Sequence, residues 1–292
     1  MTRRQWRRLL IGDFTFRRIV YSTLFIYGCL FLLACFATDW LAFRPPSRTY
    51  KQLDHLVMVP TPDGESLAVL FYPPPTSNSF TLLYSHGNAE DLGLIAPLCE
   101  VLQYFGFGVC AYDYRGYGMS SGKPHEATAV QDVLTVYDYL TNQCGLALGR
   151  IISHGRSLGG HMGLYLAAHA PVAGLIIESG FLSGTRVLTY VPIFPFERFN
   201  NLPLLSQVTC PVLVIHSTRD MVIPVWHGRK LYALAPEPKY AFWVQDADHN
   251  NLVEYAGEEY FVRLREFADS LTNSADTILS SASTLAMSEQ QP

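Results

Sequence analysis

Residues 151–169 read IISHGRSLGGHMGLYLAAH, and this stretch decides the fold. A short apolar run typical of a buried strand leads into the pentapeptide GRSLG at 155–159, and a helix-length stretch follows directly. A strand-to-helix turn this tight strains the backbone of Ser157, and the glycines on either side leave room for strand and helix to cross. The serine oxygen then lies at the positive end of the helix, where a developing negative charge is stabilised. The pattern therefore predicts that Ser157 is a nucleophile.

A serine hydroxyl needs a base that accepts its proton during attack. Where this turn carries the nucleophile, the acid and then the base follow the serine along the chain. Asp220 follows an apolar strand at 212–215 and His249 follows another at 240–244, so both lie at the carboxyl ends of strands. We expect Asp220 to accept the second ring N–H of His249, which fixes the imidazole tautomer. The predicted catalytic residues are thus Ser157, Asp220 and His249.

The oxyanion of the reaction requires donors near the serine. The backbone N–H groups of Asn88, which follows the first parallel strand, and of Leu158 are the predicted donors. Asn88 could also cap the next helix, and the two roles are compatible. Asp246 and Asp248 compete with Asp220 but share the loop of the base. The remaining candidates are interpreted as structural: His154, His161, His169, His216, Asp113 and Arg115.

Strand-like and helix-like segments alternate along the chain, which predicts a mainly parallel sheet with helices on both faces. Together with the serine turn, this predicts an α/β-hydrolase fold, with a short aromatic cap in the insertion between Ser179 and Val212. The strands are expected at 57–59, 67–72, 81–84, 108–112, 150–153, 175–177, 212–215 and 240–244, and the helices at 91–104, 126–142, 159–169, 226–235 and 255–271.

The N-terminus predicts a membrane segment. Six arginines precede an uncharged run from Ile19 to Thr38, which is long enough for a hydrocarbon core of roughly 30 Å. We expect 1–18 to be a basic cytoplasmic segment, 19–40 an anchor, and 41–272 a hydrolase domain on the other side. A cleaved signal peptide and a lipoprotein modified at Cys35 remain alternatives. Ser, Thr, Ala and Gln dominate 273–292, which predicts a disordered tail.

Composition narrows the function. The net charge of −4 gives no basic surface for nucleic acid. The six cysteines form no C-x-x-C pair and the histidines no H-E-x-x-H motif, so no metal site and no cofactor are predicted. The oligomeric state is not indicated.

Several motifs resemble one known family. The segments SHGNAEDLG, YDYRGYGMSSGKP, GRSLGG, DMVIPVWHGRKLYALAPEP and ADHNN occur in this order between Leu41 and Phe267. They look like membrane-anchored α/β-hydrolase-domain proteins, whose animal members remove palmitate from proteins, and like related bacterial hydrolases. Where the animal proteins carry an N-terminal cysteine cluster, this chain has the apolar run. The resemblance implies a serine hydrolase that acts on acyl groups.

The predicted reaction is hydrolysis of a small-molecule carboxylic ester or thioester near a membrane, without a cofactor. A peptidase of the same fold and a palmitoyl-protein thioesterase are the enzymatic alternatives. A hydrolase-fold protein that only binds a partner is the non-enzymatic one, and an intact triad disfavours it.

The arginine-rich N-terminus should stay in the cytoplasm, since each arginine costs about 2.5–3.5 kcal/mol at the bilayer centre. A reporter fused after Pro292 should therefore behave as non-cytoplasmic, and protease added to spheroplasts should digest the domain without lysis. Deleting the first 40 residues should leave a soluble, active enzyme. Digestion only after lysis would invert the predicted orientation.

Overall fold

The computed structural model describes residues 15–36, 38–189, 194 and 196–272. The chain divides into two compact units, Met1–Leu41 and Ala42–Pro292. The predicted basic segment lies mostly outside the described residues, and the predicted disordered tail lies wholly outside them.

In the first unit, helix α2 spans Phe16–Phe36. The short helix α3 spans Thr38–Ala42, so its last residue is the first of the second unit. Among the described residues, no helix has the length and apolar character that crossing a membrane requires. The structure thus supports a helix here but not the membrane segment predicted over 19–40. The helix begins at Phe16 and includes Arg17 and Arg18, which the prediction had placed outside the anchor.

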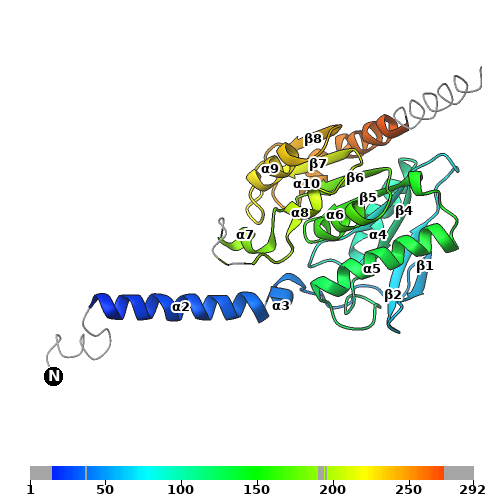
Figure 1. The fold of residues 1–292 in the computed structure, drawn as a ribbon. Coiled ribbons are helices and arrows are strands. Elements are labelled where there is room, and N and C mark those ends of the chain that lie inside the picture. Colours follow the sequence, from blue (N-terminus) through cyan, green and yellow to red (C-terminus); the bar gives the residue numbers. More distant parts are fainter. Residues whose placement is uncertain (1–14, 37, 190–193, 195, 273–292) are drawn as a thin grey trace, which may run out of the picture. The chain divides into compact units, whose positions relative to one another are not determined.

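The second unit is built on an eight-stranded sheet in the order β1-β2-β4-β3-β5-β6-β7-β8 (Figure 1). Strand β2 runs antiparallel to both of its neighbours, β1 and β4. Strands β3 to β8 run parallel to one another. The strands are β1 Leu56–Pro60, β2 Ser66–Tyr72, β3 Thr81–Ser85, β4 Gly108–Tyr112, β5 Ile151–Arg156, β6 Gly174–Glu178, β7 Val212–Ser217 and β8 Lys239–Val244.

Helices cover both faces of this sheet (Figure 1). They are α4 Leu92–Tyr104, α5 Glu126–Asp138, α6 Gly159–His169, α7 Gly184–Thr189, α8 Asn201–Leu205, α9 Trp226–Leu234 and α10 Leu252–Ala256, with a further helical stretch over 258–272. Side chains alternate between faces along a strand, so Leu82 and Tyr84 of β3 pack with α4 while Leu83 packs with α5 and α6. Strands buried on both faces explain why the sequence shows continuous apolar runs.

The predicted α/β-hydrolase fold is confirmed, and the differences are local. The helix expected at 126–142 ends at Asp138 and continues as a π-helical turn over Tyr139–Gln143. The helix expected at 255–271 is divided into α10 and the stretch at 258–272, because Gly257 adopts a φ of 55° that an α-helix does not allow. Within the predicted cap, the described residues form α7 and α8.

Close backbone contact at the end of β5 explains the two glycines of GRSLG. A Cβ on Gly155 would lie 2.2 Å from the carbonyl oxygen of Gly159. A Cβ on Gly159 would lie 1.9 Å from the carbonyl oxygen of Ser85, at the end of β3. The strand, the helix and the neighbouring strand therefore meet backbone to backbone, and only glycine fits at both positions.

We expect Gly155→Ala to lower the free energy of unfolding by about 1–3 kcal/mol or more, because the added methyl meets fixed backbone atoms. Gly149→Ala is the matched control, since a Cβ there has nothing within 4 Å. Urea unfolding midpoints measure both changes. Equal midpoints for the two variants would contradict the backbone contact as the constraint.

Candidate active site

Ser157 occupies the turn between β5 and α6 in a strained conformation. Its φ is 52°, in the left-handed region that residues with a Cβ rarely adopt. Its backbone N–H donates to the carbonyl of Glu178, at the end of the adjacent strand β6, over 2.8 Å. This bond fixes the turn to the sheet, and backbone strain of this kind is typical of functional positions.

The structure brings together the three residues that the sequence singled out. Nε2 of His249 lies 3.0 Å from Oγ of Ser157, and Nδ1 of His249 lies 2.7 Å from Oδ2 of Asp220. All three side chains are buried. Because a carboxylate can only accept, the bond to Asp220 holds the ring proton on Nδ1 and leaves Nε2 free to accept from the serine hydroxyl.

Asp220 is held by its own loop. Its Oδ1 accepts from the backbone N–H groups of Val222, over 2.9 Å, and Ile223, over 2.7 Å. Behind it, Nε2 of His216 lies 3.5 Å from Oδ2 and donates to the carbonyl of Ile223 over 2.8 Å. Burial lowers the pKa of His216. The lowered pKa favours the neutral imidazole behind the carboxylate.

The competing carboxylates point elsewhere. Oδ1 of Asp248 accepts from the backbone N–H groups of His249, over 2.7 Å, and Met221, over 3.2 Å, which lowers the pKa of Asp248. Asp246 is exposed and pairs with Arg219 over 2.8 Å. Asp248 thus joins the loop of the acid to the loop of the base, while Asp220 contacts the ring.

The two predicted oxyanion donors lie at the same edge of the sheet as Ser157. Asn88 follows β3, which pairs with β5, and its carbonyl accepts from the Tyr117 hydroxyl over 2.8 Å. Leu158 directly precedes α6 in helical conformation, so its N–H is among those that a helix leaves without an internal acceptor. The alternative role of Asn88 as a helix cap is wrong, because Asp91 caps α4 and accepts from the N–H of Leu94.

The other candidates form structural contacts. Nδ1 of His161 lies 2.8 Å from Oδ1 of Asn201, where α6 meets the cap, and Nδ1 of His169 lies 2.8 Å from the carbonyl of Tyr165. Arg115 pairs with Asp132 over 2.9 Å and also with Asp63.

His86 and His154 each face a buried carboxylate. Nε2 of His86 lies 3.5 Å from Oδ1 of Asp113, and Nε2 of His154 lies 3.0 Å from Oε2 of Glu178. Across the described part of the chain, no group of three His, Cys, Asp or Glu side chains could hold a metal ion.

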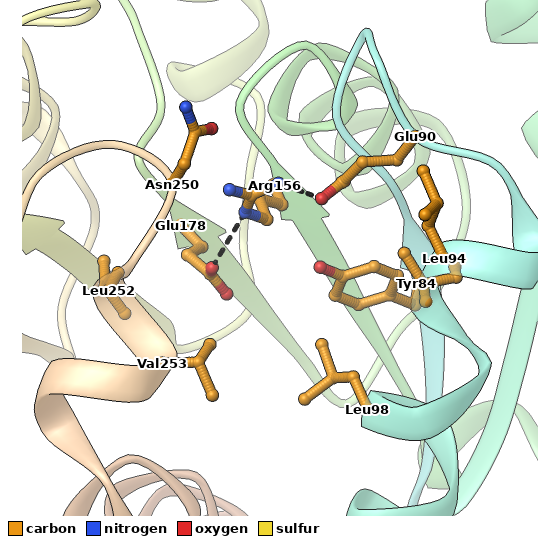
Figure 2. A pocket seen from close by; sticks show the side chains of 10 residues that line it. Tyr84, Glu90, Leu94, Leu98, Arg156, Glu178, Asn250, Leu252 and Val253 are labelled. Carbon is orange, nitrogen blue, oxygen red and sulfur yellow. Dashed lines mark hydrogen bonds and ion pairs between the residues drawn. The ribbon is translucent and has the colours of Figure 1, made fainter. Parts of the chain in front are cut away.

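Sequence reasoning missed one charged cluster beside the triad, formed by Arg156, Glu90 and Glu178 (Figure 2). Arg156 stands inside the GRSLG motif, and Glu178 ends a strand that is otherwise apolar. A carboxylate at the end of a strand buried on both faces was the available signal, since charged residues are rarely buried unless paired.

Several known proteins resemble this chain. The family described as serine aminopeptidase, S33, matches residues 77–199, which include Asn88 and Ser157 but neither Asp220 nor His249. Alpha/beta hydrolase domain-containing protein 17B of Xenopus laevis is 36% identical over 225 residues, 74% of this chain and 76% of that protein. Its human counterpart is 35% identical over 218 residues, 72% of this chain and 73% of that protein.

Solved structures share the fold at low sequence identity. An esterase of Pyrococcus furiosus superposes with a TM-score of 0.66 at 19% identity, covering 79% of this chain and 98% of the esterase chain. An esterase of Exiguobacterium antarcticum has a TM-score of 0.58 at 15% identity, covering 73% of this chain and 99% of the other. At such identities the likeness shows the fold alone.

We expect Asp220→Asn to lower kcat by roughly 10⁴-fold on an acyl ester, because the amide favours the wrong tautomer of His249. Asp248→Asn should have a far smaller effect, since its remaining carbonyl oxygen can still accept from both backbone amides. Steady-state rates of the two purified variants provide the measurement. The reverse ranking would assign the acid role to the wrong carboxylate.

Proposed function

The chain belongs to the α/β-hydrolase family, and on that premise we propose that it is a serine hydrolase that transfers acyl groups from carboxylic esters or thioesters to water. The observation that carries this proposal is the chain of hydrogen bonds from Ser157 through His249 to Asp220. Acyl transfer needs a nucleophile, a base within reach and a group that orients the base, and these three residues meet that need.

The first half of the reaction forms an acyl-enzyme. Oγ of Ser157 attacks the carbonyl carbon while Nε2 of His249 takes the hydroxyl proton, and Asp220 stabilises the resulting imidazolium. The backbone amides of Asn88 and Leu158 donate to the oxygen that becomes negative. His249 then gives its proton to the departing alcohol or thiol, and the acyl group stays on the serine.

The second half releases the acid. Water attacks the acyl-enzyme carbonyl, Nε2 of His249 takes a proton from that water, and the same proton returns to Oγ of Ser157 as the ester bond breaks. Substrate and water supply every atom that the products contain.

The relatives, the family match and the sequence of the insertion each bear on the class of substrate. The relatives at 35–36% identity are named as α/β-hydrolase-domain proteins, and a palmitoyl-protein thioesterase is the narrower possibility that the sequence resemblance implies. The match of residues 77–199 to the serine aminopeptidase family favours a peptidase as the second candidate. We place acyl esters and thioesters first because the insertion between Ser179 and Val212 is short and rich in aromatic residues in the sequence, which suits acyl chains.

Location is a separate proposal that rests on the sequence alone. The arginine distribution around residues 1–18 predicts a non-cytoplasmic catalytic domain, and the reporter and protease experiments described above test it.

We expect Ser157→Ala to abolish both turnover of acyl esters and labelling by a fluorophosphonate probe, with a rate loss on the order of 10⁴ to 10⁶. The fold should persist, because little packing volume changes, and circular dichroism checks this. A panel of acyl esters of increasing chain length, acyl thioesters and aminoacyl amides then separates esterase from peptidase. Undiminished labelling of the alanine variant would overturn the assignment of the nucleophile.

A further inference from the structure

Arg156 lies at the centre of a charged cluster that touches three parts of the candidate active site. Its Nη1 donates to Oε1 of Glu90, and its Nε lies 3.4 Å from Oε1 of Glu178. Its Nη2 donates to the backbone carbonyl of His249 over 3.1 Å. A guanidinium offers several N–H donors in a rigid fork, so one side chain can hold all three partners at once.

Each partner of Arg156 is itself tied to the reacting groups. Oε2 of Glu90 accepts from the N–H of Gly87, directly before Asn88, over 2.7 Å. The carbonyl of Glu178 accepts from the N–H of Ser157. The cluster therefore links the loop of the oxyanion donor, the nucleophile turn and the loop of the base.

The buried charges in this cluster are paired. Glu178 is fully buried and accepts at Oε2 from Nε2 of His154 over 3.0 Å and from the hydroxyl of Tyr260 over 2.7 Å. Burial alone would raise its pKa, but these donors and the charge of Arg156 lower it overall. Burial likewise works to lower the pKa of Arg156, yet the neighbouring carboxylates raise it overall. Glu178 and Arg156 thus stay ionised, and removal of Arg156 leaves the buried carboxylate of Glu178 without its guanidinium partner.

The backbone of His249 is held from both sides. On its N–H side, Oδ1 of Asp248 accepts from His249. On its carbonyl side, Arg156 donates. With both ends of the residue fixed, the ring can keep its 2.7 Å and 3.0 Å contacts to Asp220 and Ser157 at the same time.

We propose that Arg156 is a positioning residue that holds the loop of His249 against the nucleophile turn, so that the base stays aligned with Ser157. This role rests on the proposed hydrolase function. The hydrogen bonds and ion pairs of Arg156 go to Glu90, Glu178 and the backbone carbonyl of His249. Arg156 therefore acts on the base through its backbone.

A pocket of about 130 Å³ beside Arg156 makes the proposal testable by chemical rescue (Figure 2). Arg156, Glu90 and Glu178 form its polar side, and Leu98 and Val253 lie opposite. The Tyr84 hydroxyl, which also lines the pocket, has no hydrogen-bond partner among the described residues. Shortening Arg156 would join its vacated space to this pocket, which gives a free guanidinium ion a place between the two carboxylates.

The kinetic experiment compares Arg156→Met, Arg156→Lys and Arg156→Ala in the full chain on one acyl ester, with kcat normalised to sites titrated by fluorophosphonate. We expect kcat of Arg156→Met to fall about 10²-fold with KM little changed, as a small misplacement of a catalytic group does. Arg156→Lys should fall less, because it keeps the charge but lacks the fork. Guanidinium chloride should restore part of the activity of Arg156→Ala, whereas sodium chloride at equal ionic strength should not.

Arg263→Met is the control, since Arg263 is an exposed arginine that pairs with Glu259 and Glu266 on the helical stretch at 258–272. It should keep wild-type kcat. Wild-type kcat per titrated site in Arg156→Met, or an activity loss in Arg156→Ala that guanidinium does not reverse, would overturn the positioning role.

A second readout does not depend on turnover. In histidine-labelled protein, the Nδ1 proton shared by His249 and Asp220 should give a downfield NMR resonance that Arg156→Met broadens by faster exchange with water. An unchanged resonance in that variant overturns the positioning role. If the wild-type protein neither hydrolyses acyl groups nor reacts with the probe, the proposed function fails, and this resonance still decides whether Arg156 holds His249.

Discussion

The close crossing of β5 and α6 at Gly155 and Gly159 is the constraint on which the rest of the structure depends. Backbone contacts with no room for a Cβ force the strand to turn within a few residues, and Ser157 takes the left-handed conformation that this turn requires. The hydrogen bond from its N–H to Glu178 joins the turn to β6. The position of the serine hydroxyl therefore follows from backbone geometry and not from the packing of its own side chain.

The parallel sheet supplies the other groups. Because β3, β5, β7 and β8 run in the same direction, the loops after them open at one edge, where Asn88, Ser157, Asp220 and His249 meet. Residues that are far apart in the sequence, such as Ser157 and His249, thus become neighbours at this edge. The acid and base loops are then joined by Asp248, which accepts a bond from each.

Charge is buried beside this edge in a way that serves alignment more than stability. A buried ion pair gains little over well-packed apolar residues, because desolvation offsets the attraction between the charges. The cluster of Arg156, Glu90 and Glu178 instead connects three loops through directional bonds. Strands alone would leave those loops free to move relative to one another. The need to hold these loops in place accounts for Glu178 at the end of the otherwise apolar strand β6.

The sequence by itself determined the order of strands and helices along the chain, the α/β-hydrolase fold and the candidates Ser157 and His249, because apolar periodicity and the GRSLG turn are local properties of the chain. It missed the break at Gly257 and offered Asn88 as the cap of α4, where Asp91 caps the helix, since the conformations of single residues decide both outcomes. Only the tertiary structure decided which carboxylate contacts His249 and what Arg156 does. In the sequence, all three candidate carboxylates are aspartates in loops that follow strands: Asp220, Asp246 and Asp248. Their roles depend on distances that arise only when the ends of separate strands come together in the fold.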